Sequence, residues 1–294
     1  MKYFKITALV FLTGLTAVTA QNLPKASVIQ SVKTKKISIY TVVAPPEMFT
    51  NTTHVIELPH ELIVVDGQFF APYAQEVKKL TDSLHKPITR FYISHDHPDH
   101  YLGFGDAFPN VPVYALEETK EGIEKSGQQV LEQRQKQFGP IIAKSLNRPT
   151  HVQKTGKEVI DGVTFIFEES LNNEDAASLV IKIPEIKANI LQDIVYNKTH
   201  LFISGNTEGW RKAIKKEESE KKYTLILPGH GKPTDPSIFQ TDLKYLDFVD
   251  KTLESSKSKE EYKAKLLAEY PDYGGDHLID IYLTYYLKWD WNKK

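Results

Sequence analysis

Apolar residues in the first half of the chain occur in short runs that predict β-strands. Residues 36–43 alternate with a period of two, so Ile37 and Ile39 would lie on the same face of a strand. Residues 70–85 instead carry apolar side chains at helical spacing, and residues 88–94 form another apolar run. This strand–helix–strand order predicts a βαβ unit, whose functional loops gather at the carboxyl ends of the strands.

The second half of the chain is expected to add strands and then to end in helices. Residues 117–146 are polar and mostly helical in pattern, with a break at Gly139-Pro140. Residues 201–204 predict a short extended segment, and helical spacing dominates after residue 237. The sequence contains no repeat, linker or low-complexity tract. We therefore predict one domain over residues 21–294, with a helical extension at about 237–294.

Residues 1–20 have the order of a secretory signal peptide. Lys2 and Lys5 precede an apolar core at 6–18, and Ala20 ends a stretch typical of cleavage sites. The apolar core is too short for a convincing membrane span. We therefore expect an exported protein, periplasmic or secreted, without membrane association once the signal is removed.

Composition excludes several classes of protein. Hydrophobic residues make up 40% and charged residues 26% of the 294 residues, which is ordinary for a globular protein. The formal net charge of −1 provides no basic field, so no nucleic-acid partner is expected. The chain has no cysteine, which excludes disulfides and any thiolate metal ligand.

One short stretch concentrates titratable side chains. Directly after the apolar residues 91–94, the chain reads His95-Asp96-His97-Pro98-Asp99-His100. Such groups rarely gather for packing alone, because desolvated charge is costly unless it is paired or bound to metal. Imidazole and carboxylate ligands suit one or two Zn²⁺ ions, with Mn²⁺ or Fe²⁺ also possible. The alternative is a solvated turn rich in histidine and aspartate.

The pattern His-x-His-x-Asp-His resembles the signature of the metallo-β-lactamase superfamily, and the resemblance extends over about residues 37–240. It implies an α/β fold, the four-layer αββα sandwich, here with C-terminal helices added. It also implies a metal-dependent hydrolase of small molecules, in which a metal-bound hydroxide attacks a carbonyl or phosphoryl centre. In the same family, Asp66 would orient the metal loop; a turn-forming aspartate before Gly67 is the alternative.

Two later positions also resemble motifs of the family. Asp193 follows the apolar residues 189–191 at the place of the family's bridging carboxylate, and His230 follows 225–227 at the place of its last ligand. Each is expected directly after a strand, as His95 is, so ligands far apart in sequence can meet. The implied first site contains His95, His97 and a carboxylate; the implied second site contains Asp99, His100 and His230, with Asp193 between the two.

The third motif departs from the family pattern. Residues 172–178 contain no histidine where the family has one, and Glu174 is the nearest positional match, followed by Asp175. A carboxylate there would weaken the Lewis acidity of the first ion, raise the pKa of its bound water and favour a harder metal such as Mn²⁺. Alternatively, Glu174 is a loop acid in solvent, and one ion at the second site does the chemistry.

The substrate is open to three hypotheses. Tyr196 lies near the position of a tyrosine that contacts the substrate carbonyl in the lactone-hydrolysing branch of the superfamily, so a lactone or other ester is the first choice. A packed aromatic at a strand end is the alternative for Tyr196. Hydrolysis of a β-lactam is the second hypothesis, and a weakly catalytic metal- or ligand-binding protein is the third. Asp99 and Tyr196 are the candidate catalytic residues.

Six of the ten histidines lie outside these motifs and are not predicted ligands. His200 could enter the pocket, and His277 lies in a turn that could close over it. Asp96 is expected to form hydrogen bonds nearby without binding metal. The other four histidines are expected at strand ends or on the surface: His54, His60, His85 and His151.

Overall fold

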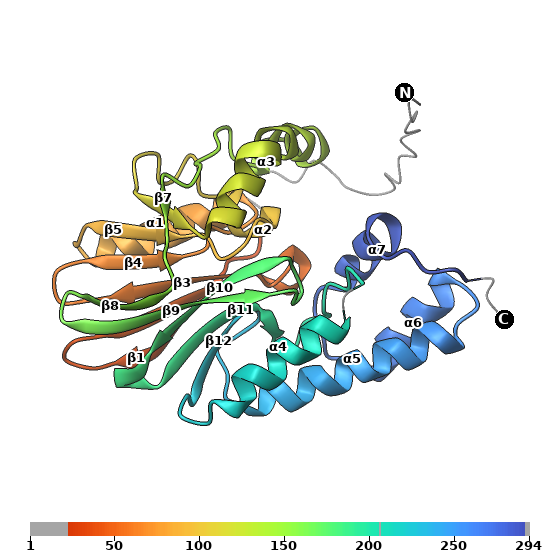
Figure 1. Cartoon of the computed structure of the whole chain (residues 1–294). Helices are drawn as coiled ribbons and strands as arrows, with labels where there is room; N and C mark the ends of the chain where they lie inside the picture. The colour runs from red at the N-terminus through yellow and green to blue at the C-terminus, as the bar shows by residue number, and fades with distance from the viewer. Residues whose placement is uncertain (1–22, 206, 292–294) are drawn as a thin grey trace.

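The computed structural model describes residues 23–205 and 207–291, so the predicted signal peptide lies outside the described residues. These residues form two β-sheets, of seven and five strands (Figure 1). The first sheet runs in the order β1 (Ser27–Lys33), β2 (Ser38–Val43), β3 (Thr52–Glu57), β4 (Leu62–Val65), β5 (Ile88–Tyr92), β6 (Val113–Ala115) and β7 (His151–Val152). The second runs in the order β12 (Leu225–His230), β11 (Ala188–Tyr196), β10 (Ala177–Ile183), β9 (Val163–Leu171) and β8 (Gly156–Ile160).

Helices cover the outer faces of both sheets, which confirms the predicted αββα sandwich with its C-terminal helical extension (Figure 1). Strands β4 and β5 are parallel and are joined through α1, as the predicted βαβ unit requires. The helices beside the first sheet are α1 (Ala71–Ser83), α2 (Pro98–Tyr101) and α3 (Glu117–Phe138). Those beside the second sheet and beyond it are α4 (Thr207–Ser219), α5 (Ser237–Ser255), α6 (Lys259–Glu269) and α7 (Asp276–Tyr285).

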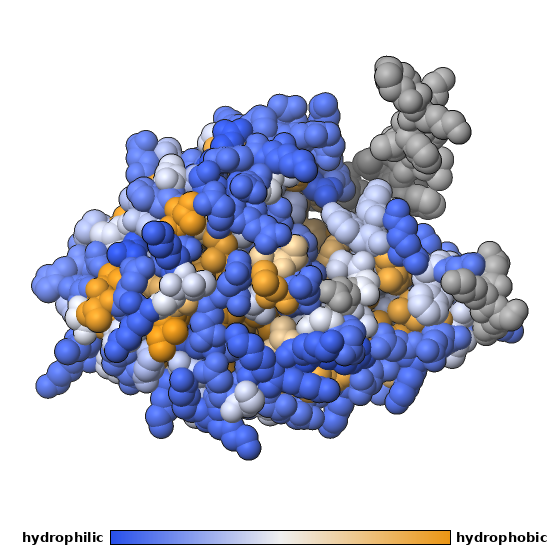
Figure 2. Space-filling view, viewed as in Figure 1, coloured by the Kyte–Doolittle hydropathy of each residue, from blue (hydrophilic) through white to orange (hydrophobic). Residues whose placement is uncertain are grey.

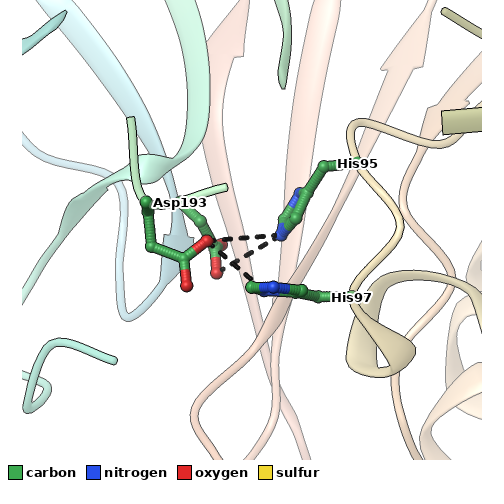
Figure 3. Close-up of side chains that lie close together, drawn as sticks. His95, His97 and Asp193 are labelled. Carbon is green, nitrogen blue, oxygen red and sulfur yellow. Dashed lines mark ion pairs between the residues drawn. The ribbon is translucent and has the colours of Figure 1, made fainter. Parts of the chain in front are cut away.

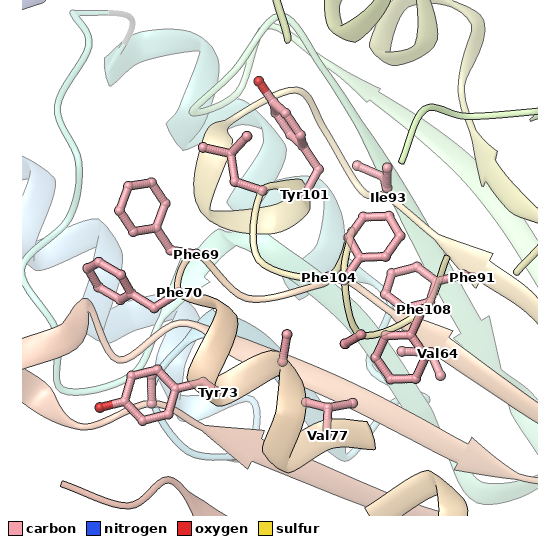
Figure 4. Close-up of a cluster of buried hydrophobic side chains, with 14 of the residues drawn as sticks. Val64, Phe69, Phe70, Tyr73, Val77, Phe91, Ile93, Tyr101, Phe104 and Phe108 are labelled. Carbon is pink, nitrogen blue, oxygen red and sulfur yellow. The ribbon is translucent and has the colours of Figure 1, made fainter. Parts of the chain in front are cut away.

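Three buried apolar clusters hold the layers together. Between the sheets, Ile39 and Ile63 pack in one cluster with Phe165 and Leu179 of the opposite sheet. The face opposite Ile39 carries Val42, which belongs to the cluster under the first helical layer, so the period of two is confirmed. Burying each such side chain contributes about 1.5–3 kcal/mol. Aromatic side chains dominate the cluster under the first helical layer, including Phe69, Phe70, Phe91, Phe104 and Phe108 (Figure 4).

One strand was missed by the sequence analysis. No strand was predicted at β1, where polar residues alternate weakly at an exposed sheet edge. The segment at 201–204, expected to be extended, lies outside the helices and strands, and Leu201 and Ile203 are buried in the cluster under the second helical layer. Burial therefore explains the apolar pattern of that segment.

The C-terminal helices return the chain to the end of the sandwich where the metal ligands lie. Gly274 forms an isolated bridge with Thr199, and α7 begins directly after Gly275. Helix α7 thereby comes to lie beside the segment that follows β11. Among the helices of residues 23–205 and 207–291, none has the length and apolar character needed to cross a membrane.

Candidate metal centre

The histidine-rich stretch leaves the end of β5 and turns at once into the short helix α2. Pro98 opens this helix, where its fixed φ and missing N–H fit the first turn. The helical turn carries Asp99 and His100 into the same space as His95 and His97, which precede it. The local sequence thus brings four side chains of ligand type together at the carboxyl end of one strand.

Asp66, which directly follows β4, holds this stretch from beneath. Its Oδ1 accepts a hydrogen bond from the main-chain N–H of Ser94 at 2.8 Å, and its Oδ2 accepts one from the Ser94 hydroxyl at 2.8 Å. The same Oδ2 lies 2.8 Å from His100 Nδ1 and accepts a further bond from Gln192 Nε2. The prediction that Asp66 orients the metal loop is confirmed. Its φ of 63° shows that it also makes the turn, as the alternative stated.

All seven predicted ligands converge in two adjacent groups. The ligand atoms within each group lie within 4.8 Å of one another. Asp193 links the groups, because its Oδ2 lies 3.7 Å from His95 Nε2 and its Oδ1 lies 3.3 Å from His100 Nε2. The first group contains His95, His97, Glu174 and Asp193, and the second contains Asp99, His100 and His230.

Asp193 and His230 come from the neighbouring parallel strands β11 and β12. Asp193 lies inside β11, so the expectation that it follows a strand end was wrong, whereas His230 is the last residue of β12. The pairing register shifts on either side of Gln192, which has a φ of 45°. Such an irregularity re-aims the side chains that follow it. Gly229 is needed beside Asp193, because a Cβ at this glycine would overlap the Asp193 carboxylate.

Glu174 lies in the turn between β9 and β10 and is only 2% exposed. The expectation of a loop acid in solvent is therefore wrong. Glu174 Oε2 lies 3.3 Å from His97 Nδ1 and 3.8 Å from His95 Nε2. Asp175 is half-buried, 3.8 Å from His97 Nε2, and outside the group. The geometry thus favours Glu174 over Asp175 at the position where the family pattern has a histidine.

Several buried polar atoms at this point fit a metal ion. Unpaired buried polar groups cost about 1–3 kcal/mol each, and a cation would satisfy them together. On the far side of the rings, Ser94 Oγ lies 2.8 Å from His95 Nδ1, and the Phe49 carbonyl oxygen lies 2.6 Å from His230 Nδ1. These contacts leave Nε2 free to ligate. The atoms without a hydrogen-bond partner are His95 Nε2, His100 Nε2, both Glu174 oxygens and Asp193 Oδ1.

The side chains also face one another as ligands of one ion would. In Figure 3, His95 and His97 approach from one side, and Asp193 approaches from the opposite sheet. Nitrogen and carboxylate oxygen donors in this number suit Zn²⁺, and the added carboxylate also suits Mn²⁺ or Fe²⁺. These residues could therefore hold a metal ion, and the donor set leaves the identity of the metal open.

Burial and charge shift the pKa values of these groups strongly in the metal-free protein. Burial and, to a smaller extent, the neighbouring His100 lower the pKa of His95 to about 4. Burial also raises the pKa of Glu174 well above its usual value, reinforced by the negative charge of Asp193. For His230, burial opposes protonation, but Asp193 prevails and raises its pKa to about 10. The site therefore holds protons that a metal ion would have to displace.

Tyr196 lies at the metal site with its hydroxyl toward the ligands. The hydroxyl donates a hydrogen bond to Asp193 Oδ2 at 2.7 Å, and the ring stacks on His230 with centroids 4.6 Å apart. Burial, then the charge of Asp193, raise the pKa of Tyr196 well above its usual value, so the phenol stays protonated. Tyr196 is both packed in the core and in contact with the site, which the two expectations had treated as alternatives.

A pocket opens directly above the ligands. His97, Asp99, Asp193, Tyr196 and His230 line its base. Apolar walls come from helices α3 and α7, and a hollow with apolar sides lies between these helices in Figure 2. The pocket residues outside the motifs include Phe49, Phe69, Arg134, Gln137, Phe138, Phe202, Leu278, Ile281, Tyr285 and Tyr286.

Some functional positions were missed by sequence reasoning, and one histidine was misplaced. Arg134 and Gln137 of α3 were not singled out, because a polar helix gives no sign of which side faces a pocket. His54 is fully buried and not at a strand end or on the surface. Its Nε2 lies 3.1 Å from the Pro228 carbonyl oxygen, which joins β3 to β12. Burial lowers its pKa to about 4.

A cluster of three glutamates lies outside this site, and lysine side chains pair with it. Glu168, Glu217 and Glu220 have the spacing of metal ligands. The ammonium group of Lys182 lies among them, 2.6 Å from Glu220 and 3.1 Å from Glu217. Its closeness to these carboxylates raises the pKa of Lys182 against the opposing effect of burial. This cluster is a buried ion network that fastens α4 to the second sheet.

The fold is that of the metallo-β-lactamases. A metallo-β-lactamase from Pontibacter korlensis is 18% identical with a TM-score of 0.59, over 75% of this chain and 99% of that one. FIM-1 from Pseudomonas aeruginosa, solved in its mono-zinc form, is 14% identical with a TM-score of 0.58, over 78% of this chain and 98% of its own. The metallo-β-lactamase DIM-1 is 12% identical with a TM-score of 0.57, over 77% of this chain and 98% of its own. No protein-family model and no curated protein match the sequence.

Proposed function

We propose that the protein is a metal-dependent hydrolase that acts on an ester or a lactone. The observation that carries the proposal is the convergence of seven ligand-type side chains, several with unpaired buried atoms, at the base of an apolar pocket. His95, His97, Glu174 and Asp193 would hold one ion; Asp99, His100 and His230 would hold a second, or the only one. A bound metal supplies a water of lowered pKa and a Lewis acid for the carbonyl oxygen.

The residues of the chain supply positioning and a proton donor. The apolar walls of the pocket bind the body of the substrate and keep bulk water away from the carbonyl. The phenol of Tyr196 stays protonated, so by turning its hydroxyl away from Asp193 Oδ2 it can donate a hydrogen bond to the oxyanion that develops as the carbonyl is attacked. Partial burial would raise the pKa of Asp99, but His100 and His230 hold it below its usual value. Asp99 is therefore ionised, the form in which it can bind a metal, and it faces the pocket as the candidate catalytic carboxylate.

Hydrolysis of a β-lactam is the second candidate, because the structures that share this fold include several metallo-β-lactamases. A β-lactam is also a strained cyclic carbonyl compound, so the same residues could act on it. A third candidate, of another class, is a weakly catalytic protein that binds a metal or a ligand, which the departure at Glu174 favours.

One screen distinguishes the three candidates. Protein loaded with zinc, or separately with manganese, is assayed for metal content and against p-nitrophenyl esters, an N-acyl homoserine lactone, a chromogenic cephalosporin and bis-p-nitrophenyl phosphate. We expect one or two ions per chain and turnover of the ester or lactone that chelation abolishes. Preferential turnover of the cephalosporin supports the second candidate. Full metal loading without turnover of any substrate supports the third. Failure to bind metal overturns both hydrolase candidates and leaves only the ligand-binding form of the third.

Export is a separate proposal that rests on residues 1–20 alone. We propose that cleavage after Ala20 leaves Gln21 as the first residue of a periplasmic or secreted protein. Mass spectrometry of the protein recovered from the periplasm or the medium gives the new terminus directly. An intact Met1 on that protein would refute the proposal.

A further inference from the structure

Among the residues that the structure describes, Arg134 is the one lysine or arginine that lines the pocket above the predicted metal ligands. It comes from helix α3, one turn before Gln137 and Phe138, which also line the pocket. The carboxylates of the same pocket, Asp99 and Asp193, lie at its base among the histidines. The pocket therefore presents one positive side chain on an apolar wall, apart from the metal ligands.

Within residues 23–205 and 207–291, no carboxylate pairs with the guanidinium of Arg134. Its Nη1 donates to the neutral Gln137 Oε1 at 2.6 Å, and its Nε is buried without a hydrogen-bond partner. By contrast, Arg90 pairs with Glu158 at 2.9 Å and Arg211 with Asp250 at 2.7 Å. A buried N–H with no acceptor is costly, and the planar fork of arginine matches the two oxygens of a carboxylate. The missing partner of Arg134 is thus an anion that enters the pocket.

The remaining walls determine the rest of such a ligand. Phe69, Phe138, Phe202, Leu278 and Ile281 surround the space with apolar surface. A small, wholly charged molecule would leave these apolar side chains exposed to water, whereas an apolar chain or ring would cover them. The ligand that satisfies both features has an apolar body and a single anionic group.

Building on the proposed hydrolase function, we propose that the substrate carries a carboxylate on an apolar body, and that Arg134 binds this carboxylate. The reacting carbonyl would lie at the metal ligands, and the carboxylate would lie on the α3 side of the pocket. Arg134 then determines specificity, because it separates anionic substrates from neutral ones of the same size.

Binding tests the proposal without requiring any turnover. The probes are the monoanilides of adipic and suberic acid, each compared with the analogue in which the carboxylate is a primary amide. Calorimetry with the zinc-loaded protein should show the carboxylate forms binding about 10–100-fold more tightly, the factor expected for hydrogen bonds to a charged group. Equal affinity for the acid and the amide would overturn the proposal.

Variants assign the effect to Arg134. Arg134→Gln should remove the preference for the acid, and Arg134→Lys should keep part of it, since lysine retains the charge but not the fork. Arg134→Met, which is apolar and unbranched, repeats the test if the glutamine variant folds poorly. The matched control is Arg148→Gln, an exposed arginine outside the pocket, which should keep the full preference. A preference that survives in Arg134→Gln would place the carboxylate on the metal and refute the assignment.

A turnover experiment separates this proposal from the proposed function. The p-nitrophenyl monoesters of the same two acids are compared with the corresponding amide-ended esters. We expect Arg134→Gln to raise KM for the acids about 10–100-fold and to leave the neutral esters within about twofold. Absence of ester hydrolysis in the parent protein would count against the proposed hydrolase function, while the binding comparison would still decide the role of Arg134.

Discussion

His100 Nδ1 lies 2.8 Å from Asp66 Oδ2, and this contact fixes which ring nitrogen of His100 faces the metal site. Asp66 is fully buried and bonds Ser94 as well, so one carboxylate orients both ends of the ligand loop. Carboxylates that hold a ligand histidine in this way raise its basicity and fix its tautomer. The consequence is that a residue outside the ligand set controls the affinity of the site.

Asp66→Asn should lower metal affinity about 10–100-fold, because the amide cannot accept every hydrogen bond that Asp66 accepts. The matched control is Asp161→Asn. Asp161 also has a positive φ and lies 2.8 Å from a histidine Nδ1, that of His60, but on the surface. Zinc titration against a competing chelator gives both affinities. Parent-like affinity in Asp66→Asn would show that Asp66 serves the turn alone.

Glu174→Gln should remove an ion from the first group while the second group keeps its own. Loss of a ligand should lower affinity by more than the roughly 10–100-fold expected for an orienting residue. Glu174→His should retain the ion and shift preference toward zinc, since imidazole is the softer donor. Asp175→Asn is the control, because Asp175 neighbours Glu174 but lies outside the group. Calorimetric titration with zinc and manganese measures both effects, and an unchanged Glu174→Gln would eliminate the carboxylate ligand.

Tyr196→Phe should lower kcat for the best ester or lactone about 100–1,000-fold, the usual cost of one oxyanion donor. The phenylalanine ring can still stack on His230, so metal content should stay near that of the parent. Tyr262→Phe is the control; it removes a buried hydroxyl that bonds Tyr282, away from the pocket. Steady-state kinetics beside elemental analysis decides the matter. A kcat for Tyr196→Phe equal to that of the parent would show that the hydroxyl of Tyr196 only orients Asp193.

Metal binding at pH 7 should release at least one proton per chain. The pKa of His230 is about 10 in the metal-free protein, so this histidine is charged at pH 7 and must lose its proton to ligate. Apparent affinity should therefore rise with pH from about 7 toward 10. Calorimetry in buffers of different ionisation enthalpy counts the protons, with His60→Gln, an exposed histidine, as the control. Heats independent of the buffer would contradict this prediction.

The same shift gives the pH dependence of folding in the metal-free protein. Because the folded pKa of His230 is raised above the unfolded value of about 6.5, its pairing stabilises the fold fully below pH 6.5. That contribution is lost as the pH rises from about 6.5 through 10. Urea unfolding of chelated protein across this range should show falling stability, and metal-loaded protein should show a smaller change.

Local sequence predicted the ligand loop, because the six residues from His95 to His100 are consecutive and therefore lie close together on one turn. Glu174, Asp193 and His230 could be assigned only through the resemblance, since nothing in their spacing brings them near that loop. The sequence does not show how the walls of the pocket come together. Arg134 and Leu278 come from helices far apart in the chain, and only the packing of α3 and α7 at one end of the sandwich places them together.

The burial of a histidine could not be predicted from its residue type either. His54 lies in an alternating strand, where a polar residue is expected to face solvent, yet Thr41, Thr52 and Pro228 satisfy it in the interior. Thr52 belongs to the same strand as His54, whereas Thr41 comes from the neighbouring strand β2 and Pro228 from β12 of the opposite sheet. Their arrangement depends on the pairing of the sheets, which the sequence of β3 does not contain.

The ligands are divided between the two halves of the sandwich. His95, His97, Asp99 and His100 follow a strand of the first sheet, whereas Asp193 and His230 belong to the second. An ion held by both sets would act as a cross-link at that end of the molecule, in a chain that has no disulfide. At a free metal concentration one hundred times the dissociation constant, such a cross-link would add about 2.7 kcal/mol to the free energy of unfolding. The stability of the folded protein would then depend in part on the concentration of free metal around it.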